Sequence, residues 1–503
     1  MSRNVRTRID RYISARQGRL LAIIALILTF VACLAHLLIG GDPVVVLVAG
    51  LTFALSICPI ALCGFLNLGA VLMALVGFQY VGFPIFAKLA MGQPLDSNLT
   101  DPRGAFLVVL LGMVGYLTAF ACASIFPVGR PILKRAKTER DLGRISIFAG
   151  MVGAVASAAI FAHAGHSHKG ISVANFFLSF FYLALISALA RNAPHSRRQT
   201  RDWRVWVLVA ALFAIGVVTN QRGVLPNLFL CLVVVKTAFD AEINWKLVAA
   251  ATGALALGVV LITPIFLRVR AFRANLTWRQ LIAETWHATS DWRETFSLYH
   301  DRSRIVGESQ GWYLRYYGAP DNILERLSLI NHVDVLKTGS DVNARYGGRD
   351  LRIALEVAIP RALAPNKPRG FSQGDWLYQT MGVQSGMGGY STAPLIGEGY
   401  ACFGWLGAFC YPFIMGFALL LLIRKISGFD LCGNIWAIFV LVLLQGPFVE
   451  GDSATYVVYF LRTLPQDLVL MWLMMRLSAI RFIGPSSVGR RLSFDRRFSS
   501  GRS

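Results

Sequence analysis

Charged residues are scarce in this sequence, and acidic residues are the scarcest of them. Charged side chains account for 15% of the 503 residues, whereas hydrophobic residues account for 55% and the mean hydropathy is +0.56. This balance excludes an ordinary soluble domain and indicates a polytopic membrane protein. The 27 acidic residues stand against 49 basic ones, which leaves a net charge of +22. Since most basic residues flank apolar runs, where they set membrane topology, the charge does not indicate a nucleic-acid partner.

Cysteine is absent from the one long polar segment, residues 268–393. All eight cysteines lie in or beside apolar runs, so that segment cannot contain a disulfide framework. The sequence also has no Walker, GxSxG or HExxH motif, so nucleotide hydrolysis and zinc proteolysis lose their usual support. His163, His166 and His168 lie close together, but their spacing fits no common zinc pattern. We therefore predict neither a metal site nor another cofactor.

The chain instead contains twelve apolar runs, most of them close to the about 20 residues that a transmembrane helix needs. They predict an all-α polytopic membrane protein with about 12 transmembrane helices. The predicted spans are residues 20–38, 44–62, 68–89, 104–125, 145–161, 171–190, 205–218, 224–235, 247–267, 394–423, 432–449 and 455–475.

The distribution of Lys and Arg predicts which side of the membrane each connection faces. With twelve spans, the cytoplasmic segments carry 28 Lys and Arg residues, whereas the short external loops carry only Arg103, Lys169 and Arg222. Merging the seventh and eighth runs into a single span would place the arginine-rich C-terminal tail outside, so we take them as a hairpin. Both termini are then cytoplasmic, as basic tails at 1–19 and 476–503.

One external loop of 126 residues, 268–393, separates the first nine helices (20–267) from the last three (394–475). It carries 16 basic and 12 acidic residues, and 14 of the 16 are arginine. Arginine presents a planar fork of donors that suits phosphate. For any single arginine a solvated basic surface is the simpler interpretation. The preference for arginine over lysine across the whole loop, however, predicts an anion site at the membrane surface.

The loop residues that could bind such an anion lie before, on and after a predicted helix, 323–336. The candidates are Arg315, Arg326, Arg345, Arg349, Arg352, Arg361 and Lys367. Pro360, Pro365 and Pro368 predict an extended path that holds Arg361 and Lys367 at set positions.

Two groups of aromatic residues lie in the first half of the loop. The first recurs at roughly helical spacing and consists of Trp278, Ile282, Trp292 and Phe296. It is typical of an amphipathic helix that lies on a membrane with tryptophan at the interface. In the second group, Trp312 and the tyrosines at 313, 316 and 317 surround Arg315. These rings could stack on a sugar or fill a small core, and the sequence favours neither.

Charges within or beside the predicted spans form a further set of candidates. Arg222 lies at the hairpin tip, where a guanidinium either grips a phosphate or extends to the interface; the cost of burying a charge favours the phosphate. Glu398, flanked by glycines at the mouth of the tenth span, suits a general base or a helix N-terminal carboxylate. Arg462 and Asp467 lie inside the twelfth span, as a functional site or as a pair. His300 is a second candidate proton acceptor.

Three short segments carry a resemblance to a known family. They are Asn220-Gln221-Arg222-Gly223, Pro360-Arg361 with Pro365-Asn366-Lys367-Pro368, and Gly397-Glu398-Gly399-Tyr400 with Phe403-Gly404-Trp405-Leu406-Gly407. Together with the twelve-span layout they make the chain resemble Wzy-type polymerases of O-antigen and exopolysaccharide repeat units. The resemblance implies a GT-C-like membrane glycosyltransferase of the bacterial inner membrane, with the long loop in the periplasm and without a nucleotide-sugar donor.

The resemblance also implies substrates and roles. A hydroxyl of one undecaprenyl-pyrophosphate-linked oligosaccharide would attack the anomeric carbon of another, and undecaprenyl pyrophosphate would leave. Arg222, Arg326 and Arg361 would stabilise the departing pyrophosphate. Glu398, with His300 behind it, would accept the proton. Trp312, Arg315, Arg345, Arg349, Arg352, Lys367 and Arg462 would bind the substrate.

Other functions fit the same layout. The related O-antigen ligases would transfer the chain to a lipid acceptor, a flippase would move the lipid-linked oligosaccharide without bond formation, and a scaffold would have no activity of its own. Against a transporter, the sequence has no visible internal repeat and has a long external loop. For the polymerase, the implied partners are membrane lipids and a chain-length regulator and flippase of the same pathway.

Overall fold

The computed structural model describes most of the chain, and every regular element in the described part is helical. The described residues are 3–133, 138–163, 177–192, 202–219, 224–240, 243–272, 278–298, 316–317, 327–359 and 393–479. The helices before the long loop are α1 (Arg3–Leu38), α2 (Pro43–Cys63), α3 (Leu68–Gly77), the π-helix η1 (Phe78–Gly82), α4 (Phe83–Ala90), α5 (Pro102–Ile125), α6 (Glu139–His163), α8 (Phe180–Asn192), α9 (Trp203–Thr219), α10 (Val224–Asp240) and α11 (Trp245–Phe272).

The long loop contains short helices, as expected, and three more apolar segments follow it. The loop helices are α12 (Trp278–Ser290), residues 292–298, α15 (Ile330–Asn343) and α16 (Arg349–Ala358). After the loop come α18 (Leu395–Ile426), α19 (Ile435–Glu450), α20 (Ser453–Val458), the π-helix η3 (Tyr459–Thr463) and α21 (Leu464–Ala479). The loop helix predicted at 323–336 corresponds to α15, which continues to Asn343.

The helices follow the predicted spans. Each of the twelve predicted spans overlaps a helix or a run of consecutive helices. Over the described residues, seven segments have the length and composition to cross a membrane, as in a polytopic helical membrane protein: Ala15–Leu38, Pro43–Cys63, Leu68–Ala90, Pro102–Ile125, Glu139–Ala159, Leu395–Ile426 and Ser453–Arg476. The apolar helices α8, α9 and α19 have only 13, 17 and 16 residues. At 1.5 Å per residue they fall short of the about 30 Å hydrocarbon core.

Short polar residues determine where several of these helices begin. Asp42 and Asp101 each precede a proline, and their side chains accept the backbone N–H of Val44 and Gly104. The side chains of Asn67, Asn434 and Asp452 cap α3, α19 and α20 in the same way. An Asp or Asn cap satisfies an orphan donor at the helix start, and proline fits the first helical position because it has no N–H to satisfy.

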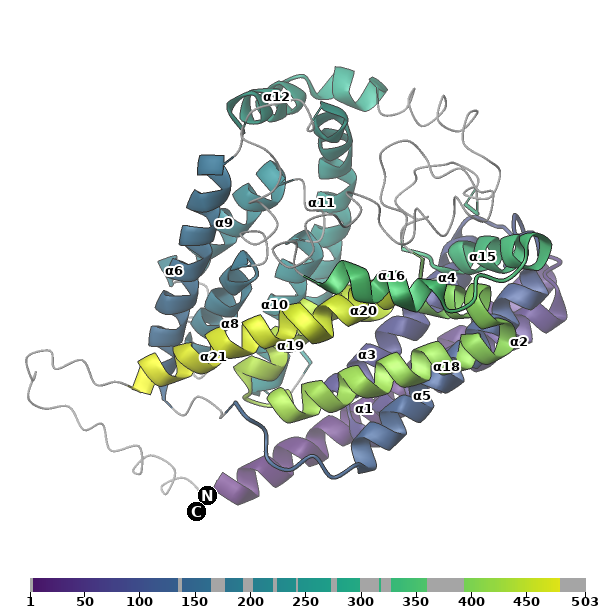
Figure 1. Ribbon diagram of the computed structural model, residues 1–503, viewed down its shortest axis with the longest axis horizontal. Coiled ribbons are helices and arrows are strands. Elements are labelled where there is room, and N and C mark those ends of the chain that lie inside the picture. The colour runs from purple at the N-terminus through teal and green to yellow at the C-terminus, as the bar shows by residue number, and fades with distance from the viewer. Residues whose placement is uncertain are drawn as a thin grey trace, which may run out of the picture.

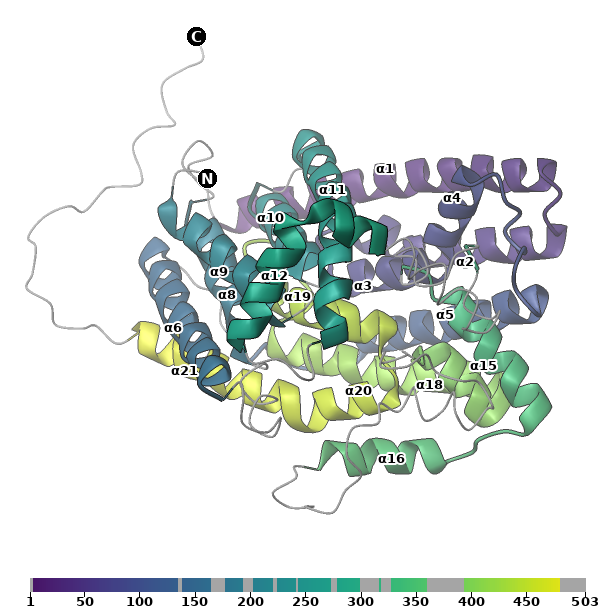
Figure 2. The same ribbon diagram turned by 90° about the horizontal axis from the view of Figure 1, so that it is seen from above.

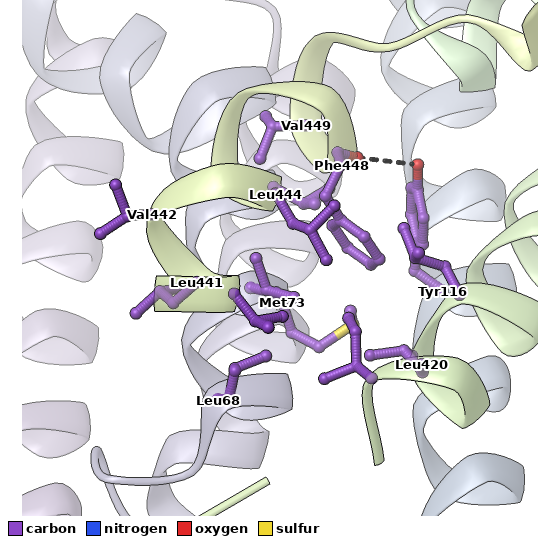
Figure 3. Close-up of a cluster of buried hydrophobic side chains, with 14 of the residues drawn as sticks. Leu68, Met73, Tyr116, Leu420, Leu441, Val442, Leu444, Phe448 and Val449 are labelled. Atoms are coloured by element: carbon purple, nitrogen blue, oxygen red, sulfur yellow. Dashed lines mark hydrogen bonds between the residues drawn. The ribbon is translucent and has the colours of Figure 1, made fainter. Parts of the chain in front are cut away.

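The core lies where α3, α5, α18 and α19 meet (Figure 3). Tyr116 of α5 packs against Phe448 of α19 with ring centroids 5.2 Å apart, and both side chains are fully buried. Glycines bring α5 and α18 together: a Cβ on Gly115 would lie 2.5 Å from the backbone oxygen of Phe409, and one on Gly112 would meet the Ile396 side chain at 2.6 Å. Small residues of this kind allow close backbone approach between membrane helices.

Figures 1 and 2 show how the loop helices sit on this bundle. α18 runs beside α5, α15 lies over their ends, and α16 lies against α20. At the other side, α12 lies across the end of α11. The described parts of the long loop are therefore attached to the membrane helices at two separate places.

Candidate functional site

The membrane helix α18 is broken near its N-terminal end. Phe403 (φ −136°, ψ 15°) and Gly404 (φ 66°, ψ −144°) leave the helical conformation. The carbonyl groups before the break therefore lose their helical partners. The long loop supplies new ones, since the Tyr346 N–H donates to the Ala401 carbonyl at 3.0 Å and the Gly347 N–H donates to the next carbonyl at 3.1 Å. The loop and the broken helix thus form one hydrogen-bonded unit.

The geometry of the break explains why residues 399, 404 and 407 are glycines. Gly404 has a positive φ that side-chain-bearing residues rarely adopt. A Cβ on Gly399 would lie 2.4 Å from the carbonyl oxygen of Gly407, and a Cβ on Gly407 would lie 1.9 Å from that of Gly399. The backbones of the two halves of α18 touch there, so glycine is needed on both sides of the break.

Among the described residues, Arg345 places its guanidinium at this break. Its Nη1 donates to the Tyr400 carbonyl at 3.3 Å, and the guanidinium carbon lies 5.0 Å from the centre of the Tyr400 ring. Its Nη2 lies 3.5 Å from the Asp341 carboxylate, and the side chain is 41% exposed. A cation at the end of a helical segment is favoured by the helix dipole, and stacking on tyrosine adds to this. The break therefore carries a fixed, half-exposed positive charge.

The helix α15 is fastened to the membrane helices along its length. At its start, the Leu329 N–H donates to the Gln79 carbonyl at 3.2 Å, within the π-helix η1, where the wider turn interrupts the regular hydrogen-bond ladder. The buried Asp334 carboxylate accepts the N–H groups of Thr100 and Asp101, each at 2.8 Å. These contacts fix the position of α15 and, with it, that of Arg345, which lies two residues after the helix ends.

A charged cluster lies between α15 and the mouth of α18. Lys337 pairs with Asp101 and, at 2.8 Å, with Asp341, whose carboxylate also accepts the Tyr400 hydroxyl at 3.0 Å. Burial works to lower the pKa of Lys337, but hydrogen bonds to the two aspartates raise it above its usual value. Burial works to raise the pKa of Asp101, but the bond from Lys337 leaves it below its usual value. The cluster is nearly balanced in charge, and Arg345 is its most exposed cation.

The attachment of α15 is expected to weaken in acid. Because the pKa of Asp101 is depressed in the folded state, its contribution to stability is present above the ordinary aspartate pKa of about 3.9 and is lost as the pH falls through the lower folded value. The protection factors of the α15 amides, which compare their exchange rates with those of an unfolded peptide at the same pH, should therefore fall in acid in the wild type. Lys337→Met should reduce this fall. A pH profile that is the same in both proteins would contradict the pairing.

Glu398 is fully buried at the start of α18. Its Oε2 accepts the Ser453 N–H and its Oε1 accepts the Ser453 hydroxyl, both at 2.7 Å. The carboxylate therefore satisfies a donor at the start of α20, where the helix dipole favours a negative charge. As it stands in the structure, Glu398 joins two membrane helices, and a role as general base would require its exposure.

Glu398 and Ser453 are expected to be energetically coupled. Glu398→Gln presents an amide N–H₂ to one of the two Ser453 donors and should cost about 2 kcal/mol of the free energy of unfolding. Ser453→Ala removes one of those donors, so Glu398→Gln should cost less by about 1 kcal/mol in that background. Unfolding of the two single variants and the double variant in detergent would measure this. Strictly additive losses would contradict the coupling.

The remaining described candidates lie apart from the break. Arg349 and Arg352 are exposed on α16, where Arg352 pairs with Glu356 at 3.0 Å and its side chain is 82% exposed. Arg462 is partly buried in the π-helix η3. Asp467 is buried, and its two carboxylate oxygens have no hydrogen-bond partner among the described residues, so the structure does not join it to Arg462. The structure thus brings together only Arg345 and the mouth containing Glu398.

Seven predicted site residues lie outside the described residues. They are Arg222, His300, Trp312, Arg315, Arg326, Arg361 and Lys367. Next to Arg222, the structure has two separate helices, since α9 ends at Thr219 and α10 begins at Val224. A Cβ on Gly216 would meet the Val224 side chain at 2.8 Å, so the two helices pack closely beside their connection.

Two of the loop tyrosines belong to a small core. Tyr316 and Tyr317 are buried; the Tyr316 hydroxyl donates to the Leu95 carbonyl at 2.8 Å, and Phe83 packs against Tyr317 at 6.1 Å. The ammonium of Lys88 lies 4.2 Å from the centre of the Tyr316 ring. For these two rings the structure supports the packing interpretation over sugar stacking.

Sequence reasoning missed the residues that surround Arg345. The most informative signal was the spacing of Lys337, Asp341 and Arg345, four residues apart in turn, which predicts ion pairs on one helix face. No local pattern pairs Asp101 with Lys337, which follows it by 236 residues. Nothing local to the sequence linked Ser453 to Glu398.

In the described part of the chain, no group of three or more His, Cys, Asp or Glu side chains could hold a metal ion. No known protein family, curated protein sequence or solved structure matches the chain. Any function assigned to the protein must therefore rest on its own residues and on how they are arranged.

Proposed function

We propose that the protein is a membrane glycosyltransferase that polymerises undecaprenyl-pyrophosphate-linked oligosaccharide repeat units at the periplasmic face of a bacterial inner membrane. The observation that carries the proposal is the position of Arg345. It is a half-exposed guanidinium, held by the long loop at the break of a membrane helix. The pyrophosphate of a lipid-linked substrate would need a cation where the headgroup meets the hydrocarbon layer.

The surface beside Arg345 also suits a lipid. Phe403, Trp405 and Leu406, which form and follow the break, are exposed, and Leu406 is 70% exposed. Trp405 packs against Tyr400 with ring centroids 5.3 Å apart, so the apolar patch and the cation share one aromatic support. An amphiphile with an anionic head and an apolar chain would satisfy both parts of this surface.

The transfer requires two groups from the protein. The hydroxyl of the acceptor unit forms a bond to the anomeric carbon, the bond from that carbon to the pyrophosphate oxygen breaks, and the hydroxyl proton passes to a base. Arg345 would stabilise the pyrophosphate that leaves with the electron pair, together with Arg222, Arg326 and Arg361. Asp341, exposed beside Arg345, is a candidate base in addition to Glu398.

The purified protein tests this proposal directly. Reconstituted into vesicles with lipid-linked repeat units, it should produce a ladder of longer lipid-linked chains on a gel. A single new product on a lipid acceptor would instead indicate a ligase. Movement of the repeat unit across the bilayer without chain growth would indicate a flippase and would rule out the polymerase.

A further inference from the structure

One arginine connects α12 to the membrane helix that precedes it. Arg268 lies near the end of α11, and its side chain is only 14% exposed. Its guanidinium donates to Glu284 of α12 at 3.2 Å, to Glu294 at 3.2 Å and to the Thr295 hydroxyl at 2.9 Å. It also lies 3.1 Å from a ring nitrogen of His287. Arg268 thus joins α11 both to α12 and to the helical residues 292–298 that follow it.

The buried residues in the described part of α12 and of residues 292–298 are small. They are Ala288, fully buried, and Thr295, whose hydroxyl donates to the Ala288 carbonyl at 2.9 Å. A buried threonine bonded in this way is satisfied.

Four large apolar residues of α12 and of residues 292–298 are exposed. Trp286 is 75% exposed, and Ile282, Phe296 and Leu298 are also exposed. Ile282 and Trp286 are four residues apart and therefore lie on one side of α12. Burying a side chain of this size contributes roughly 1.5–3 kcal/mol, so these four residues favour an apolar partner.

The bilayer is the partner that the surroundings favour. α12 begins only five residues, 273–277, after α11, which contains the predicted span 247–267. Figures 1 and 2 show α12 crossing the end of α11 rather than continuing it. The other large exposed apolar side chains lie chiefly on the membrane helices, for example along α1. Tryptophan, moreover, is favoured at the boundary between headgroups and hydrocarbon.

We infer that the face formed by Ile282, Trp286, Phe296 and Leu298 is a lipid-docking face, inserted into the interfacial layer of the bilayer at the end of α11. The sequence predicted an amphipathic surface helix here. The structure adds that these four side chains are exposed, while Arg268 holds Glu284 and Glu294 against the end of α11. Docking would fix the start of the long loop at the membrane surface, and it holds for a transferase and for a transporter alike.

Photolabelling by lipid tests the docking. The full-length protein is placed in nanodiscs of phospholipid that carries a diazirine in its acyl chain, then irradiated, and adducts are mapped by peptide mass spectrometry. Peptides covering 278–298 should be labelled within about threefold of the α1 peptides, which serve as the positive control. Labelling at least about tenfold below that of α1 would overturn the inference and would indicate that another protein or a second copy covers this face.

A pair of variants at one position sharpens the test. Trp286→Phe keeps an apolar ring and should keep the labelling of 278–298. Trp286→Glu places a charge in the docking face and should lower that labelling about tenfold, while the α1 peptides stay unchanged. Equal labelling of the two variants would overturn the inference.

Discussion

Replacing Arg345 with glutamine is expected to reduce chain growth by the purified protein about a hundredfold, the usual loss when one donor to a developing negative charge is removed. Glutamine can still donate one hydrogen bond but carries no charge for the departing pyrophosphate. The fold should survive, because the N–H groups of Tyr346 and Gly347 continue to cap the broken helix. The yield of ladder products at matched protein concentration measures the effect, and the unfolding temperature shows whether the fold is intact.

A second arginine, in a connection that the sequence predicts to be external, provides the matched control. Arg103 pairs with Asp42, and its side chain is 63% exposed. Arg103→Gln removes the same charge and should leave chain growth nearly unchanged, because exposed ion pairs contribute about 0–1 kcal/mol. Arg345→Lys should retain part of the activity, since it keeps the charge but loses the planar fork. Equal losses for Arg103→Gln and Arg345→Gln would mean that Arg345 acts only through net surface charge.

Gly404→Ala is expected to destabilise the break both through its backbone conformation and through Arg345. The backbone at Gly404, with φ 66° and ψ −144°, lies in a region that is nearly restricted to glycine and costs other residues about 1–3 kcal/mol. The added Cβ would also lie 1.9 Å from Nη1 of Arg345, so the guanidinium has to move. Both the unfolding temperature in detergent and the chain-growth activity should therefore fall.

Gly92→Ala separates the two causes of that loss. Gly92 has the same φ of +66°, but a Cβ there would meet nothing within 4 Å. It should lose only the backbone contribution of about 1 kcal/mol and keep its activity. If Gly404→Ala were no worse than Gly92→Ala, the contact between Gly404 and Arg345 would not matter.

Composition and periodicity were enough to place the helices, because a bilayer requires long apolar segments whose backbone groups are satisfied internally. They do not give the length of each helix: α8, α9 and α19 overlap predicted spans but have 13, 17 and 16 residues. Helix ends depend on caps and on tertiary contacts that a hydropathy profile does not contain.

The sequence predicted which types of residue form the candidate site, but not how they are arranged in space. Arginine enrichment in the loop and the glycine-rich segment around Glu398 were both visible. The break at Gly404 was not, because it is stable only when Arg345 and its neighbours, 55 residues earlier than the carbonyls they bond, cap the open helix. The same holds for Glu398, whose two donors come from Ser453, also 55 residues away.

The sequence by itself determined that this is a helical membrane protein with one long, arginine-rich loop, since hydropathy and charge are sums over local residues. Only the tertiary structure decided which arginine meets the membrane helices, that Glu398 is buried on Ser453, and that the apolar face of α12 points outward. Each of these depends on hydrogen bonds between segments far apart in the chain. Such bonds form because buried polar groups must find partners, and which partner is within reach is decided by packing.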